Sequence, residues 1–474
     1  MPPTSGLRIQ GELGRDRVGP IRRLVRAATV ATLTALLVAA PVPVLAHQLG
    51  GTFRSPLPLA FYLLGAAIAV AASFGLAFRR DVLVPKPSLG RMRTAPAWLR
   101  VALQAVGILA WLWVLVQTLV LGGSSEADVS SLFLWVYGWV GLALVSGLLG
   151  PVWSWLDPFS TLHRALTRLG RLGGRTDRSS ELWPEGLGRW PAVVGYVFFV
   201  WLELVATGGA GGPNLGAALL VYSLVTLAGM VWLGRSGWRR RGEVFSVWFG
   251  LLGRLAPWRS LGDPARGRVT RQPFASGIVH ARWATDEVVL VAVATAAVMF
   301  DGLSQTVPFF QLFGLPSLGT STLLLFAFLA LVAGAVLGVS RIAGLAAVGA
   351  GLLPIALGYI TAHYLTFLIG DGQRIFIALS DPFQQGWDLL GTAFFRPSID
   401  WLPGSVLWAV QLGAVVSGHV VGAWAGHAAA LAHAGPDADR RSLVRRQIPL
   451  AMLMVVLTVV TLWSLGQALV EPTP

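Results

Sequence analysis

The 474-residue sequence contains no cysteine and few charged residues. Without cysteine, the chain cannot build a disulfide scaffold, a zinc–thiolate site or a cysteine nucleophile. Charged residues make up 12% of the chain, about half the fraction that a soluble domain carries. Hydrophobic residues make up 55%, which excludes intrinsic disorder because so much apolar surface does not stay in water.

Lysine is also nearly absent, since Lys86 is the only one among 36 cationic residues. In a soluble protein, the net charge of +14 would indicate nucleic-acid binding. In a chain this apolar the membrane must be considered first, because charges beside membrane spans follow their own distribution. We therefore expect a lipid bilayer, and no nucleic acid, as the partner.

Residues 1–46 show the order of regions typical of a secretory signal peptide. Six arginines precede the apolar run 27–40, and the small residues Val44 and Ala46 fit a cleavage site. The run has about 14 residues, whereas a span needs about 20. We expect cleavage after Ala46, and an uncleaved first helix is the alternative.

Cleavage would make His47 the N-terminal residue on the outer face. Its amine and imidazole together form a good pair of ligands for a transition metal such as copper or zinc. The alternative is a solvated residue that happens to follow the cleavage site.

Ten apolar segments in residues 47–474 are long enough to cross a membrane. We expect helices, because lipid cannot satisfy exposed backbone groups. The predicted fold class is therefore all-α, a polytopic transmembrane bundle in a single integral membrane domain. The segments lie near 58–78, 99–122, 132–155, 190–209, 214–234, 286–309, 318–340, 342–369, 403–432 and 447–468.

Cationic residues occupy every second linker between these segments. Outside residues 1–46, all of them except Arg54, Arg374 and Arg396 lie at or within 79–100, 156–190, 235–283, 341 and 434–446. By the positive-inside rule these linkers are cytoplasmic. We therefore expect an inner-membrane protein whose mature N- and C-termini are both extracytoplasmic.

The linker 235–283 contains an apolar stripe of helical period over residues 242–257, flanked by arginines. This pattern predicts an amphipathic helix that lies on the inner membrane surface. Anionic lipid would hold such a helix there. A site for a regulatory partner is the alternative.

Ten spans divide into two halves of five with opposite topology, as in many transporters. Asp157-Pro158-Phe159 follows the third span, and Asp381-Pro382-Phe383 follows the eighth, its counterpart. This match supports an inverted repeat, although Asp-Pro is also a common turn opener.

A few ionisable residues lie inside the apolar segments, where a charge costs roughly 2.5–3.5 kcal/mol. Carboxylates and imidazoles bind zinc or copper and also serve in acid–base chemistry. We therefore predict an outward-facing site whose candidate metal ligands are His47, Glu203, Asp301, His363 and His419. The alternatives are interhelical hydrogen bonds and axial ligation of haem by His363 and His419.

The outer loop 370–402 is the longest outer segment, and long loops tend to be functional. It contributes Asp371 and Asp381 as candidate catalytic bases. We expect it to form either a lid over the site or an interfacial anchor through Trp387 and Trp401.

Several segments together are similar to those of one protein group. They are His47-Gln48-Leu49-Gly50-Gly51, Pro56-Leu57-Pro58-Leu59, Ala72-Ser73-Phe74, Asp301-Gly302, 380–388 and 446–463. These segments resemble bacterial, mainly actinobacterial, multi-pass membrane proteins labelled fenitrothion hydrolase-like. The resemblance covers most of the mature chain and implies hydrolysis of a phosphotriester. It carries over no catalytic residue.

The leading hypothesis from the sequence is thus a metal-assisted membrane hydrolase, because metal-activated water attacks phosphorus at neutral pH. One alternative is a transporter or permease subunit with an ion-coupling site. Another is a copper- or haem-binding membrane subunit that assembles with a membrane or extracytoplasmic partner. The sequence leaves open whether the protein is an enzyme.

Overall fold

The structure is a computed structural model. It describes residues 59–79, 92–122, 129–150, 152–170, 183–206, 212–260, 267–434 and 438–466. The predicted signal peptide and His47 lie outside these residues. The chain is 77% helical with almost no sheet in the described residues, which fits the predicted all-α helical bundle.

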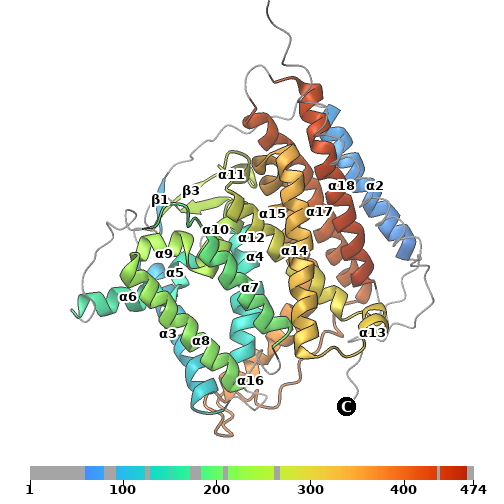
Figure 1. Ribbon diagram of the computed structural model, residues 1–474. Helices are drawn as coiled ribbons and strands as arrows, with labels where there is room; N and C mark the ends of the chain where they lie inside the picture. The colour runs from blue at the N-terminus through green and yellow to red at the C-terminus, as the bar shows by residue number, and fades with distance from the viewer. Residues whose placement is uncertain are drawn as a thin grey trace, which may run out of the picture. The chain divides into compact units, whose positions relative to one another are not determined.

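The first half of the described chain runs from α2 to α10 (Figure 1). Its elements are α2 (Leu59–Arg79), β1 (Arg93–Thr94), α3 (Ala97–Leu119), the π-helix η1 (Leu132–Gly141), α4 (Leu142–Leu148), α5 (Trp153–Leu156), α6 (Pro158–Arg168), α7 (Trp190–Leu204), α8 (Gly212–Trp232), α9 (Arg235–Arg241) and α10 (Val244–Leu252).

The second half begins with two strands and then returns to helices. Its elements are β2 (Trp258–Ser260), β3 (Arg268–Arg271), α11 (Ser276–Val279), α12 (Thr285–Ser304), α13 (Val307–Phe313), α14 (Leu318–Ala343), α15 (Leu345–Gly370), the 3-10 helix η4 (Asp371–Arg374), α16 (Ile375–Ser380), α17 (Gly404–Ala432) and α18 (Arg440–Leu465). The strands form a small antiparallel sheet of order β1-β3-β2. In Figure 1 this sheet, α9 and α11 lie at the upper ends of the long helices, and α13 and α16 lie at the lower ends.

Eight described helices are long and apolar enough to cross a membrane, which fits a multi-pass membrane protein. They are α2, α3, α8, α12, α14, α17, α18 and the segment Leu345–Ser380, which begins with α15. The predicted spans near 132–155 and 190–209 correspond to shorter apolar helices, Leu132–Leu148 and Trp190–Leu204. The count of ten and the inverted repeat stay predictions.

Helices α12 and α15 form the interior of the bundle. In α12, 89% of the apolar span is buried, whereas the figure for α3 is 6%. The outer faces of α2 and α3 expose large apolar side chains, among them Phe61, Ile68, Val101 and Leu109. Such surfaces suit contact with lipid chains, which are as apolar as the side chains themselves.

Small residues bring α15 and α17 into close, antiparallel contact. A Cβ atom added at Gly418 would lie 2.8 Å from the Pro354 carbonyl oxygen. One added at Gly422 would clash with the Gly351 carbonyl oxygen. These are backbone atoms that cannot turn aside, so the approach of the two helices requires glycine at both positions.

The linker helix α10 is largely buried in the protein. The apolar stretch 242–257 forms a helix over Val244–Leu252, and this helix packs against α4, α5 and α7. Trp248, for example, is fully buried and its ring lies 5.7 Å from that of Tyr196. A position at the inner membrane surface stays a prediction.

Glu243 begins α10 as its N-cap residue. Its carboxylate accepts hydrogen bonds from the backbone N–H groups of Phe245, at 3.0 Å, and Ser246, at 2.6 Å. The Tyr222 hydroxyl donates to the same carboxylate. Burial raises the pKa of Glu243, and the nearby charge of Asp157 raises it further. Asp157 itself is paired with Arg239 at 3.1 Å.

Ion pairs connect the start of α12 to two of the basic linkers. Glu287 is fully buried, and its Oε1 atom lies 2.5 Å from Nη2 of Arg254 and 3.1 Å from Nη2 of Arg189. The guanidinium of Arg254 also stacks over the Trp283 ring at 5.1 Å. Asp286 accepts a 2.5 Å hydrogen bond from the backbone N–H of Arg189. These arginines therefore belong to the folded core as well as to the basic linkers.

We predict that Gly422→Ala destabilises the protein by about 1–3 kcal/mol, because the new methyl group forces α15 and α17 apart. Gly413→Ala in the same helix is the matched control, since a Cβ there meets no atom within 4 Å. Thermal unfolding in detergent should separate the two variants. Equal unfolding temperatures would contradict the close-contact interpretation.

We also predict that Glu287→Gln costs about 3 kcal/mol, because it leaves two guanidinium groups beside a neutral amide in a buried setting. Glu185→Gln, at an exposed position, should change stability by less than about 0.5 kcal/mol. Chemical unfolding monitored by tryptophan fluorescence measures both. A loss for Glu287→Gln no larger than the control's would show that the pairs add no net stability.

Candidate functional site

A buried polar cluster surrounds Asp301 at the end of α12. His363 Nε2 lies 2.8 Å from Asp301 Oδ2, and the Tyr364 hydroxyl donates to the same oxygen at 2.9 Å. Gln305 Nε2 donates to the other oxygen, Oδ1, at 2.5 Å. The Asp301 and His363 side chains are only 10% and 17% exposed. Because an ionised carboxylate only accepts hydrogen bonds, three donors around it stabilise its charged form.

The local sequence explains this geometry. Asp301 lies in the last turn of α12, and Gln305 follows four residues later as the C-cap residue, so both project toward the same side. His363 and Tyr364 are neighbours in α15, with ring centroids 4.6 Å apart and ring planes almost perpendicular. Gly302 leaves room for the His363 ring beside α12, because a Cβ at this position would lie 3.4 Å from the ring.

Glu203 adds a second carboxylate to the cluster. It is partly buried in the last turn of α7 and interacts with the Tyr364 hydroxyl and with the charge of Asp301. Tyr196 lies about two turns before Glu203 on α7 and interacts with both Glu203 and Tyr364. Tyr364 therefore interacts with two carboxylates, Glu203 and Asp301, and donates its hydroxyl hydrogen bond to Asp301.

The sequence predicted Glu203, Asp301 and His363 in the outer half of the bundle. The structure joins Asp301 to His363 at 2.8 Å, and Glu203 interacts with the charge of Asp301. The sequence analysis did not identify Tyr364 or Gln305 as neighbours of Asp301. A signal for Gln305 existed, since residues four apart in a helix are neighbours. Tyr364 could have been suspected only as the residue beside His363. Whether any of them binds a metal stays a prediction.

His419 makes its contacts elsewhere, between α17 and α15. Its Nδ1 atom donates to the Val415 carbonyl oxygen at 2.8 Å, and its Nε2 atom lies 3.4 Å from the Tyr359 hydroxyl. The first contact lies within α17, and the second connects α17 to α15, so His419 is a fully buried histidine between two helices. Axial ligation of haem by His363 and His419 stays a prediction.

The metal-ligating residues of the described chain do not gather in larger sets. Within the residues that the structure describes, no group of three or more histidine, aspartate or glutamate side chains could hold a metal ion. A structural or catalytic zinc site uses at least three protein ligands. A copper or zinc site at Asp301 and His363 would therefore need a ligand from outside these residues, such as His47.

The two candidate catalytic bases, Asp371 and Asp381, interact with neighbouring residues of the segment 370–402. Asp381 accepts backbone hydrogen bonds from Gln385 and Gly386, each at 2.8 Å. Asp371 begins η4 and interacts with the charge of Arg374. Their predicted catalytic role is untested. Trp387 and Trp401 are 44% and 67% exposed, which is compatible with both the lid and the interfacial anchor.

A further carboxylate, that of Asp388, connects two parts of this loop by hydrogen bonds. Its Oδ1 atom accepts hydrogen bonds from the Ala393 backbone N–H at 2.9 Å and from the Ser380 hydroxyl at 2.7 Å. These donors favour the charged carboxylate and lower the pKa of Asp388 below its usual value.

Because the folded pKa of Asp388 is lowered, its stabilising effect is complete above the unfolded pKa and is lost as pH falls through the folded one. We predict that Asp388→Asn reduces the hydrogen-exchange protection of residues 380–393 at pH 7. The difference from wild type should shrink as pH falls below about 4 and disappear only below the lowered folded pKa of Asp388. Asp400→Asn, which hydrogen-bonds Ser398 instead, is the control and should leave residues 380–393 unchanged. A difference that persists in acid would contradict this role.

Comparisons of the chain with protein-family models, curated proteins and solved structures find no match. The resemblance to fenitrothion hydrolase-like proteins accordingly stays a prediction.

Proposed function

We propose that this chain is a multi-pass transporter or permease subunit in which the Asp301–His363 pair takes up and releases a proton. The observation that carries the proposal is the 2.8 Å contact between the carboxylate and the imidazole inside an apolar bundle. Ionisable groups are expensive there and are rarely kept without a role. An imidazole adds a group that can both accept and donate a proton.

The surrounding side chains supply a path for the proton. His363 and Tyr364 both contact Asp301, and Glu203 interacts with Asp301 and Tyr364. Each of these groups can accept a proton on one side and release one on the other. Protonation of Asp301 would remove the charge that attracts His363 and Tyr364, and thereby loosen the contact between α12 and α15.

The proposed orientation follows from the arginines. The basic linkers lie on the cytoplasmic side by the positive-inside rule, and the opposite helix ends, which include Asp301 and Glu203, face outward. The proton site would then open toward the extracytoplasmic side of the inner membrane. An acidic outer surface around it would attract cations.

Metal-assisted hydrolysis is the other reading that the sequence supports, and it requires a ligand set that Asp301, His363 and Glu203 do not complete by themselves. If His47 supplies the missing ligand, the purified protein should contain copper or zinc and His47→Ala should lose it. A proton site, by contrast, needs only the hydrogen-bonded pair of Asp301 and His363.

We predict that Asp301→Asn lowers proton flux at least about tenfold, because the amide cannot change its charge. The measurement uses proteoliposomes with an internal pH dye and an imposed potassium diffusion potential. Infrared difference spectra recorded across a pH step provide a readout that does not depend on the substrate. A titrating carboxyl band should be present in wild type and absent from Asp301→Asn.

Asp400→Asn is the matched control, since it makes the same chemical change on the exposed outer loop. It should keep both the flux and the infrared band. Unchanged flux and an unchanged carboxyl band in Asp301→Asn would overturn the proposal. Loss of bound copper or zinc in that variant would support the metal site in its place.

A further inference from the structure

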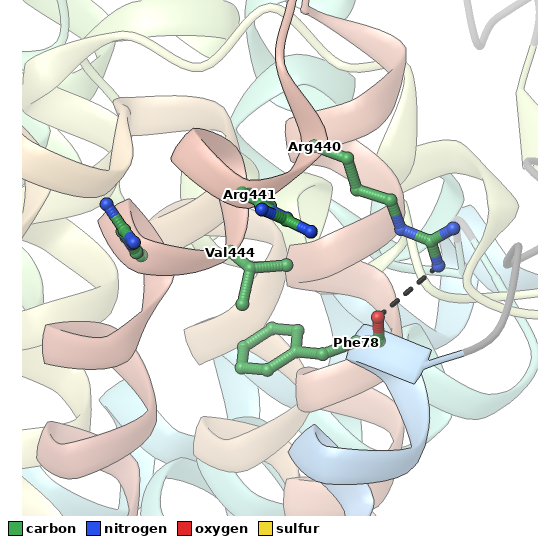
Figure 2. A pocket seen from close by; sticks show the side chains of 5 residues that line it. Phe78, Arg440, Arg441 and Val444 are labelled. Carbon is green, nitrogen blue, oxygen red and sulfur yellow. Dashed lines mark hydrogen bonds between the residues drawn. The ribbon is translucent and has the colours of Figure 1, made fainter.

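A basic pocket lies where the end of α2 meets the start of α18. Its volume is about 280 Å³, and its lining residues are Phe78, Arg440, Arg441, Val444 and Arg445. Figure 2 shows the labelled arginine side chains above the ring of Phe78, with Val444 between Arg441 and that ring. Three cations and two apolar side chains therefore share one small cavity.

The start of α18 explains why the cations gather there. Asp439 caps this helix by accepting hydrogen bonds from the backbone N–H groups of Arg441, at 3.2 Å, and Ser442, at 3.0 Å. Arg441, Val444 and Arg445 follow at the spacing that places side chains on one helical face. Arg440 reaches across to α2, where its Nη2 atom donates to the Phe78 carbonyl oxygen at 3.3 Å (Figure 2).

The apolar side of the pocket is firmly supported. The Phe78 ring packs against the Phe74 ring at 5.7 Å and against the His427 ring at 5.3 Å. His427 is itself fully buried, and its Nδ1 atom interacts with Gln447 of α18 at 3.0 Å. Phe78 is therefore held in place, and it offers a preformed apolar surface beside the guanidinium groups.

The charge of the pocket favours an anion. Among the described residues, its lining includes no acidic side chain, and the carboxylate of Asp439, the N-cap residue of α18, is hydrogen-bonded to the helix N-terminus. Guanidinium groups that line one pocket repel one another, and a shared anion reduces that repulsion. Arginine binds phosphate oxygens in a planar, two-pronged geometry that suits phosphate better than other anions.

The position of the pocket favours a lipid. α2 and α18 are both candidate spans, and only 17% of the apolar span of α2 is buried, so this helix belongs to the outside of the bundle. The pocket lies at the ends of these helices, where lipid headgroups are found. In the orientation proposed above, this is the cytoplasmic leaflet, whose anionic lipids attract basic segments.

We propose that this pocket binds the phosphate headgroup of an anionic phospholipid from the cytoplasmic leaflet. The guanidinium groups of Arg441 and Arg445 contact the phosphate, while Phe78 and Val444 contact the start of the lipid's apolar part. Pockets for drug-sized ligands usually have volumes of about 300 Å³ or more, and this cavity is slightly smaller. It therefore accommodates a headgroup, while the acyl chains lie along α2.

The test measures lipid binding to the full-length purified protein by native mass spectrometry. Phosphatidylglycerol, zwitterionic phosphatidylethanolamine and inorganic phosphate are added separately. We expect phosphatidylglycerol to bind at least about tenfold more tightly to wild type than to Arg441→Gln/Arg445→Gln, because each cation contributes to the attraction. Phosphatidylethanolamine should bind both proteins weakly.

The matched control is Arg259→Gln/Arg446→Gln, which removes the same charge from two exposed arginines that do not line the pocket. It should retain wild-type affinity for phosphatidylglycerol. If the first double variant does not fold, the single variants Arg441→Gln and Arg445→Gln carry the same comparison. Folding is checked by thermal unfolding, and proton flux through Asp301 provides an independent readout.

Three results would overturn the proposal. The first is an equal loss of affinity in the control, which would show a general charge effect. The second is equal binding of phosphatidylglycerol and phosphatidylethanolamine. The third is displacement of bound lipid by inorganic phosphate at comparable concentration, which would identify a site for soluble phosphate.

Discussion

The structure depends on the burial of α12, a helix that is apolar through its middle and acidic near both ends. At its start, Glu287 is neutralised by Arg254 and Arg189, which come from separate linkers. At its end, Asp301 is surrounded by His363, Tyr364 and Gln305. A carboxylate inside a bundle needs such partners. The elements that supply them, α7, α15 and the linker after α10, are thereby fixed around α12.

The second constraint is the close packing of α15 against α17. Helices in lipid gain little from the hydrophobic effect between them, so close backbone approach must supply the attraction. Gly418 and Gly422 permit this approach along one side of α15. The other sides of α15 are then free to contact α12 and η1. His363 thus sits on a helix whose position is fixed by glycines several turns away.

The sequence predicted the long apolar helices well, because a run of about 20 apolar residues has few alternatives. It also identified Asp301, His363 and Glu203 as unusual, since charge is rare in such runs. It could not predict the burial of α10, because amphipathic and fully buried helices differ only in what surrounds them. Nor could it separate His419 from the Asp301 cluster, because the direction in which His419 points depends on how α17 packs against α15.

Helix α18 connects the two ends of the molecule. It begins among the arginines at Phe78, and near its other end Ser464 faces Gly302, where a Cβ would lie 3.3 Å from the serine hydroxyl. Its 26 residues span about 39 Å, with Pro449 as an interior discontinuity. One helix therefore carries both the basic pocket at its first turn and the serine that packs against Gly302, the neighbour of Asp301. Pro449 lies between these two parts and removes one backbone hydrogen bond from the helix.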